Sequence, residues 1–89
     1  MKLKDGFVLE EVGGAFLAVA VGDRAEEVNA LIRMNGTGAF LWNLLSEGDK
    51  TEEELLNEML REYDVPEEIA RADIKRFVKQ LCDGGLIDA

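Results

Sequence analysis

Side chains that commonly carry out catalysis or bind metals are scarce in this sequence of 89 residues. It contains no histidine and only one cysteine, Cys82. A chain without histidine lacks the commonest general base and the commonest metal ligand. A lone cysteine with no histidine to activate it forms neither an internal disulfide nor a zinc site made of several thiolates. We therefore expect Cys82 to be a small, partly buried apolar residue, and we predict no catalytic residue, no bound metal and no cofactor.

Acidic residues occur in short runs, which could indicate a metal site or general acid–base chemistry. The runs lie at residues 10–11, 26–27, 52–54 and 67–68. The last two fall where helices are predicted to begin, and a carboxylate in the first turn interacts favourably with the positive end of the helix dipole. The sequence therefore favours a solvated, helix-stabilising role over a metal site.

Two glycines in Gly36-Thr37-Gly38 stand between a predicted strand and a predicted helix, where a phosphate-binding loop would lie. Their spacing matches neither the G-x-G-x-x-G nor the Walker pattern, and no lysine follows. A sharp turn from strand to helix explains them better than a phosphate cradle. Trp42 follows on the same predicted helix, and packing at the edge of the core is favoured for it over contact with a ligand.

The last predicted helix gathers four of the ten basic residues of the chain, which are Arg71, Lys75, Arg76 and Lys79. At 100° per residue, three of them follow an i, i+4, i+8 line beside Val78 and Cys82. One interpretation is that these cations pair with neighbouring glutamates and with the helix dipole. The other is that they form one wall of a groove for an acidic or amphipathic peptide.

The first third of the chain has the pattern of antiparallel strands. Phe7–Val12 and Ala15–Val21 are two β-prone runs separated by a Gly-Gly pair. Because glycine tolerates the positive φ of a tight turn, this pattern predicts a two-residue β-hairpin. Gly22–Glu27 is a polar connector that could hold one helical turn. Val28–Met34 alternates and is predicted to join the sheet as an antiparallel third strand.

Two helices are predicted next. The first begins between Asn35 and Thr37, whose side chains can cap free backbone N–H groups, and it ends around Gly48. The second starts at Thr51, and Glu54 stands at the spacing of a capping box.

A third helix is predicted to open at Asp64, to carry Pro66 in its first turn, and to run to about Asp83. Together these elements predict one α+β domain over residues 1–89, with an N-terminal three-stranded antiparallel sheet followed by a three-helix bundle, in a winged-helix-like arrangement. The residues predicted to be mainly buried are Leu9, Phe16, Leu17, Ile32, Phe40, Leu44, Leu56, Leu60, Phe77 and Leu81.

The charge of the chain limits its partners. Nineteen Asp and Glu residues outnumber ten Lys and Arg residues, which gives a net charge of −9. Nucleic-acid binders normally concentrate cations against phosphates, so nucleic acid is disfavoured as a partner.

No apolar run approaches the ~20 residues of a membrane span, and no signal sequence opens the chain. The lone cysteine agrees with a reducing compartment. We therefore expect a cytoplasmic protein with no membrane partner.

The junction between the third strand and the first helix, residues 29–42, reads NALIRMNGTGAFLW. In the order of three strands and then three helices, its pattern N-x-L-I-x-x-N-x-T-G-A-F-x-W resembles the PqqD-like family, the peptide-recognition modules of peptide-modifying pathways. The resemblance covers nearly the whole chain. Residues 35–40 are similar to the broad group of stand-alone PqqD-like proteins rather than to the member dedicated to pyrroloquinoline quinone, so the kind of precursor peptide stays open.

This resemblance implies that the protein binds the leader region of a ribosomally made precursor peptide. The leader adds as a fourth strand beside the third strand, in the groove against the third helix. The peptide-binding residues that it implies are Val28, Asn29, Ala30, Leu31, Ile32 and Arg33 on the strand, and Arg71, Lys75, Val78, Lys79 and Cys82 on the helix. The partner that it implies is a radical S-adenosylmethionine (SAM) maturase, which brings the iron–sulfur chemistry that this chain lacks.

Two other functions stay open on the sequence. One is a winged-helix regulator that binds DNA, which salt-sensitive retention on duplex DNA would identify. The other is a small structural subunit whose open sheet edge pairs with a second copy, which a concentration-dependent size would identify. The leading interpretation is a non-catalytic peptide-binding module that is a monomer or a weak homodimer.

Overall fold

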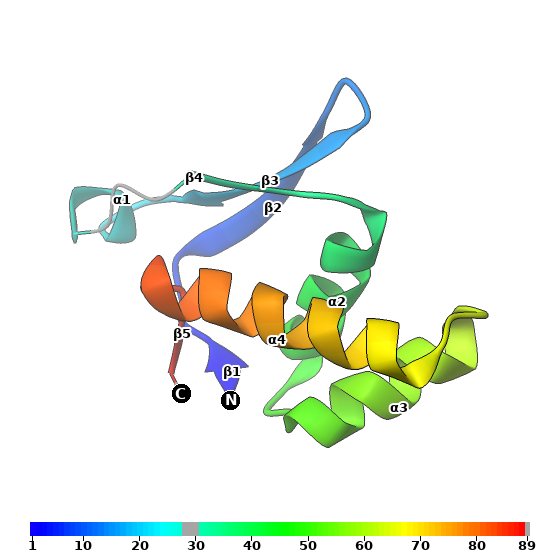
Figure 1. Ribbon diagram of the computed structural model, residues 1–89. Helices are drawn as coiled ribbons and strands as arrows, with labels where there is room; N and C mark the ends of the chain where they lie inside the picture. The colour runs from blue at the N-terminus through cyan, green and yellow to red at the C-terminus, as the bar shows by residue number, and fades with distance from the viewer. Residues whose placement is uncertain (28–30, 89) are drawn as a thin grey trace.

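A three-stranded antiparallel sheet forms the N-terminal part of the computed structural model, which describes residues 1–27 and 31–88 (Figure 1). Its strands are β2 (Phe7–Val12), β3 (Ala15–Ala20) and β4 (Leu31–Met34), in the spatial order β2-β3-β4. Gly13 and Gly14, with φ of 58° and 83°, make the two-residue turn between β2 and β3, and residues with a side chain rarely adopt such angles. The predicted hairpin and the antiparallel addition of a third strand are both confirmed.

The sheet has an inner face that packs on the helices. Ala18, Ile32 and Met34 are buried on this face, at 8% exposure or less. Leu9 and Phe16 are partly buried against the same core. Side chains alternate between the two faces of a strand, so the residues between these lie on the outer face.

Leu17 is one of the outer-face residues, and its prediction as a core residue is wrong. It stands opposite Glu10 on β2 and Arg33 on β4, which are both exposed. Leu17 is half-buried and does not belong to the core cluster. The physical reason is the alternation of the strand, because Ala18 takes the inward position and leaves its neighbour on the other side.

Three long helices lie together on the inner side of the sheet (Figure 1). They are α2 (Gly36–Glu47), α3 (Glu52–Glu62) and α4 (Glu67–Asp83), in the predicted order. A fourth helix, α1 (Arg24–Glu27), is a four-residue turn in the polar connector, which the sequence indicated could hold one helical turn. The α+β fold is therefore confirmed, with one short helix more than predicted. Helix α4 begins three residues later than predicted, because the residue before a proline disfavours the helical conformation and Pro66 itself is the extended N-cap.

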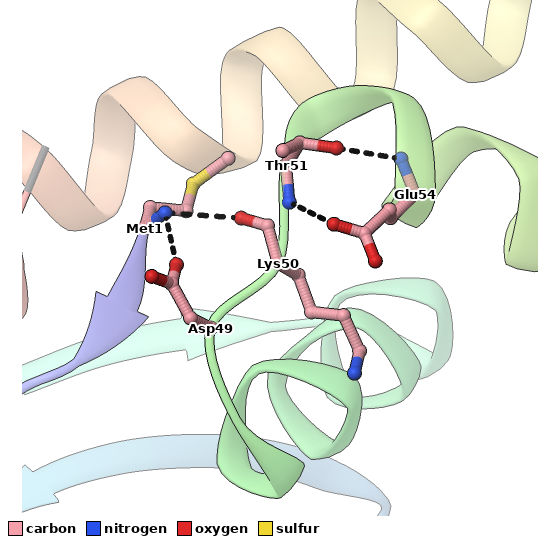
Figure 2. A network of polar contacts seen from close by, with 5 residues as sticks. All are labelled: Met1, Asp49, Lys50, Thr51 and Glu54. Atoms are coloured by element: carbon pink, nitrogen blue, oxygen red, sulfur yellow. Dashed lines mark hydrogen bonds and ion pairs between the residues drawn. The ribbon is translucent and has the colours of Figure 1, made fainter.

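Side-chain caps hold the starts of α2 and α3. The Asn35 Oδ1 accepts a hydrogen bond from the Gly38 N–H at 2.9 Å. At α3 the Thr51 Oγ1 accepts from the Glu54 N–H at 3.1 Å, while the Glu54 Oε1 accepts from the Thr51 N–H at 3.0 Å (Figure 2). The predicted capping box is confirmed. Each cap satisfies backbone donors that the helix itself leaves free.

On α2, two of the residues predicted to be mainly buried are more exposed than their neighbours. Leu41, Trp42 and Leu45 are at most 3% exposed, whereas Phe40 and Leu44 are half-buried at the edge of the core. Trp42 is a core residue, as predicted. The other predicted core residues divide in the same way. Ile32, Leu56, Phe77 and Leu81 are buried, and Leu9, Phe16 and Leu60 pack on the core while partly exposed.

A second, two-stranded sheet brings the two ends of the chain together (Figure 1). It pairs β1 (Lys2–Leu3) with β5 (Ile87–Asp88), neither of which was predicted, because two residues carry no periodicity. The Met1 amine donates to the Asp49 Oδ1 at 2.6 Å and to the Lys50 carbonyl at 3.0 Å (Figure 2). This contact lowers the pKa of the Asp49 carboxyl, through the hydrogen bond first and the charge of the amine second.

Candidate functional site

The backbone of β3 divides its hydrogen-bonding groups between its two neighbours. In an antiparallel ladder, successive residues alternate between facing one neighbour and facing the other. The Val21 N–H donates to the Gly6 carbonyl at 2.8 Å, just beyond the paired strands. By alternation from Val21, the backbone groups of the odd-numbered residues of β3 face β2. The groups of Phe16 and Ala18 therefore face β4.

The same alternation leaves one side of β4 without a neighbouring strand. Ile32 and Met34 stand opposite Ala18 and Phe16, so their backbone groups face β3. The N–H and C=O groups of Leu31 and Arg33 consequently point away from the sheet. No backbone hydrogen bond joins them to the described residues outside the sheet. An edge of this kind is a template on which another strand can pair.

A cavity of about 310 Å³ lies where β4 turns into α2 and passes α4. It is lined by Arg33, Met34, Asn35, Thr37, Gly38, Leu41, Asp73, Arg76, Phe77 and Gln80. Its apolar side chains are themselves part of the core. Its polar side chains come in equal number from the junction of β4 and α2 and from one flank of α4. The cavity thus borders the end of β4, because Arg33 and Met34 belong to that strand.

The Gly-rich junction is explained by close packing. A Cβ atom placed at Gly38 would lie 2.8 Å from the Cβ of Met34, which is closer than side chains approach. The same position lies in the first turn of α2, where the Asn35 Oδ1 accepts from both the Gly38 N–H and the Thr37 hydroxyl. Gly38 therefore lets the helix start directly against β4, in agreement with the predicted sharp turn.

One flank of α4 borders the cavity. Asp73 and Arg76 form an ion pair on it, and Gln80 is exposed one turn further on. Phe77, which is 6% exposed, lines the cavity beside them. On this flank α4 therefore offers an anion, a cation, an amide and an aromatic ring to the cavity.

Two basic residues on the other flank of α4, Arg71 and Lys79, are engaged with acids. Arg71 donates to Glu53 of α3 at 2.7 Å and to Glu67 at 3.0 Å, and the hydrogen bond with Glu53 is the larger cause of the raised pKa of Arg71. Lys79 donates to Asp83 at 2.8 Å, which raises the pKa of Lys79. These pairs are exposed, so solvent screens them and each contributes little to stability.

The strand part of the predicted site is only partly within the described residues. Residues 28–30 lie outside them. Leu31 and Arg33 provide the outward backbone groups, as a strand-addition site requires. Ile32 faces the core and is 8% exposed.

The α4 part of the predicted site does not border the cavity. Arg71 reaches toward α3, Val78 and Cys82 pack partly against the core, and Lys75 and Lys79 are exposed. The α4 residues that do border it include Asp73, Arg76 and Gln80, which sequence reasoning missed. A helical periodicity identifies the buried face of α4 but not which of its two flanks lies beside β4, so no signal in the sequence distinguished them.

Within residues 1–27 and 31–88, no group of three or more acidic or cysteine side chains is placed to hold a metal ion. Over the same residues, none of the helices has both the length and the apolar character needed to cross a bilayer.

A solved structure shares this architecture. The structure superposes on TbiB1, solved in complex with the TbiA(beta) leader peptide, with a TM-score of 0.75, 22% sequence identity, and coverage of 100% of this chain and 96% of that one. No curated protein matches the sequence. Residues 24–87, which run from α1 through the open edge strand, the Gly-rich junction and α4, match the family described as coenzyme PQQ synthesis protein D. A match over that much of the chain shows that this protein belongs to the PqqD family.

Proposed function

We propose that this protein is a non-catalytic module that binds the leader of a ribosomally made precursor peptide and presents it to a separate modifying enzyme. The observation that carries the proposal is the open edge of β4, where the backbone groups of Leu31 and Arg33 point outward next to a cavity. A peptide that pairs with this edge gains affinity from main-chain hydrogen bonds. The side chains beside the edge then supply specificity.

Two findings support this proposal. The chain belongs to the PqqD family, and the solved structure that it resembles contains a leader peptide. The chemistry of the chain agrees, because the sequence has no histidine and a single cysteine to offer for catalysis. The modifying enzyme that we propose as its partner is a radical SAM maturase, which supplies the reactive chemistry.

The proposed contacts on β4 are the outward backbone groups of Leu31 and Arg33. The sequence-based strand site covers residues 28–33, of which residues 28–30 lie outside the described residues. On α4 there are two possible flanks. The sequence-based flank comprises Arg71, Lys75, Val78, Lys79 and Cys82. The cavity favours the opposite flank, with Arg76 and Gln80, because this flank lies beside the end of β4.

Two tryptophan substitutions at adjacent exposed positions test the proposal and separate the flanks. The probe is a synthetic leader peptide of a ribosomally made precursor, selected for binding to the wild type and titrated by calorimetry. In Gln80→Trp the indole fills the cavity, so we expect the dissociation constant to rise about tenfold or more. In Lys79→Trp the indole lies on the other flank, and we expect a change of less than about twofold. Circular dichroism checks that both variants are folded.

The reverse result would assign the peptide to the flank of Lys75 and Lys79. Equal affinities for the wild type and both variants would remove α4 from the binding site. If no leader peptide binds the wild type, the proposed function is wrong.

A further inference from the structure

We propose that the outer face of the sheet pairs with the same face of a second copy, and that the protein forms a weak two-fold dimer. The contact uses the face of the sheet and leaves the β4 edge open. It therefore does not depend on the proposed binding of a leader peptide.

The outer face is apolar where a solvated sheet face is normally polar. Val8 and Val12 on β2 are 38% and 58% exposed. Leu17 and Val19 on β3 are half-buried, and neither belongs to the core cluster. Helices α2, α3 and α4 lie on the other side of the sheet (Figure 1). Antiparallel sheets with one wet face usually alternate apolar residues inside with polar residues outside, so this face is one that a partner would cover.

The charges on this face identify the partner. One cross-strand row reads Glu10, Leu17, Arg33, with the acid on β2, the apolar residue at the centre and the base on β4. Glu10 and Arg33 are exposed, and neither forms an ion pair with another described residue. A row with opposite charges at its two ends is complementary to the same row of a second copy that runs in the opposite direction.

A two-fold axis parallel to the strands places the rows of the two copies face to face in opposite directions. It lays β3 on β3 and β2 of each copy on β4 of the other, as in the aligned packing of two sheets. Glu10 then faces Arg33 of the second copy, twice in the dimer, and Leu17 packs on its own equivalent. An axis across the strands would instead set Glu10 against Glu10, and like charges placed opposite each other are unfavourable.

The size of the face predicts weak association. Three short strands spaced ~4.8 Å apart present roughly 300 Å² per copy, well below the ~800 Å² per partner of a stable interface. Two chains of net charge −9 also repel each other at long range, and this repulsion is largely screened beyond ~8 Å at physiological salt. We therefore expect dimers at protein concentrations of roughly 0.1–1 mM rather than at low micromolar ones.

Analytical ultracentrifugation of charge-swapped variants tests the dimer. Wild type should associate as its concentration is raised to about 1 mM. Glu10→Arg and Arg33→Glu should each weaken association about tenfold, because each turns two attractive contacts into repulsive ones. The double variant should associate like wild type, since the reversed charges face each other again. Arg61→Glu and Glu62→Arg on α3 make the same charge changes away from the sheet and should leave association unchanged.

Val8→Asp adds a second readout, because it places a charge in the apolar part of the face at a position exposed enough to tolerate it. We expect it to abolish the dimer while circular dichroism shows an unchanged fold. A protein that stays monomeric at 1 mM would overturn the proposal, as would a dimer that Val8→Asp leaves intact. A double variant as weak as the single ones would also exclude this arrangement.

Discussion

At the scale of single residues, the feature that organises the site is the contact between Gly38 and Met34. Met34 is the last residue of β4 and is 8% exposed, and Gly38 lies in the first turn of α2. Because a Cβ at Gly38 would come within 2.8 Å of the Met34 Cβ, the glycine is what allows the helix to begin against the strand. The end of the open edge and the cavity beside α4 are thereby held together.

Replacing Gly38 with alanine is therefore expected to destabilise the fold. The clash should cost about 1–3 kcal/mol, of which the better helix propensity of alanine returns up to ~1 kcal/mol. Gly36, in the same turn, has open space around its Cα, so Gly36→Ala should be neutral or slightly stabilising. Urea unfolding of both variants checks the comparison. Equal stabilities would mean that the close approach at Gly38 has no energetic consequence.

Two leucines test which side chains form the core. Leu45 is 2% exposed inside the helices, whereas Leu17 lies on the outer face of the sheet. Leu45→Ala should lower the free energy of unfolding by about 2–5 kcal/mol, because it opens a cavity in a packed core. Leu17→Ala, measured at a low micromolar concentration, should cost less than half as much. Similar losses for the two would show that the outer face is packed after all.

At the scale of elements, local signals predicted most of the architecture. The Gly-Gly turn needs positive φ at both positions, and the Thr51 and Glu54 caps need only a spacing of three, so both could be found without knowing the fold. Elements that depend on distant partners could not be found in this way. Strands β1 and β5 have two residues each and exist because the ends of the chain meet.

The rotational position of α4 shows the same limit. Its periodicity identified Phe77 and Leu81 as buried. Whether the flank of Arg76 or the flank of Lys79 lies beside β4 depends on how α4 packs against a strand more than thirty residues earlier in the sequence. Only tertiary packing decides that, and the sequence-based site was therefore placed on the flank that does not border the cavity.

The start of α3 offers a direct test of one local signal. Thr51→Ala removes the acceptor of the Glu54 N–H and should cost about 1 kcal/mol of stability. Ser46→Ala is the matched substitution, because the Ser46 hydroxyl donates to the Trp42 carbonyl at the end of α2 and caps no free N–H. We expect a change within about 0.5 kcal/mol for it. If the two variants unfold at the same denaturant concentration, the capping box does not stabilise α3.

At the scale of the whole molecule, the long helices cover one face of the sheet and, over the described residues, leave its other face and the β4 edge uncovered (Figure 1). The helices fill the inner side of the sheet, β4 offers its open edge, and the outer face remains apolar. A net charge of −9 disfavours the DNA-binding alternative, since phosphates would be repelled. The open edge is therefore the part of the molecule on which the proposed function depends.

Amide hydrogen exchange with and without the synthetic leader peptide tests that dependence most directly, because the sheet contains its own control. The amides of Leu31 and Arg33 face the open side of β4, and by the same alternation those of Phe7, Leu9 and Glu11 face the open side of β2. Peptide added as a strand on β4 should slow exchange at Leu31 and Arg33 about tenfold or more and leave the β2 amides unchanged. Protection of the β2 amides instead, or of neither edge while the peptide is bound, would contradict the account.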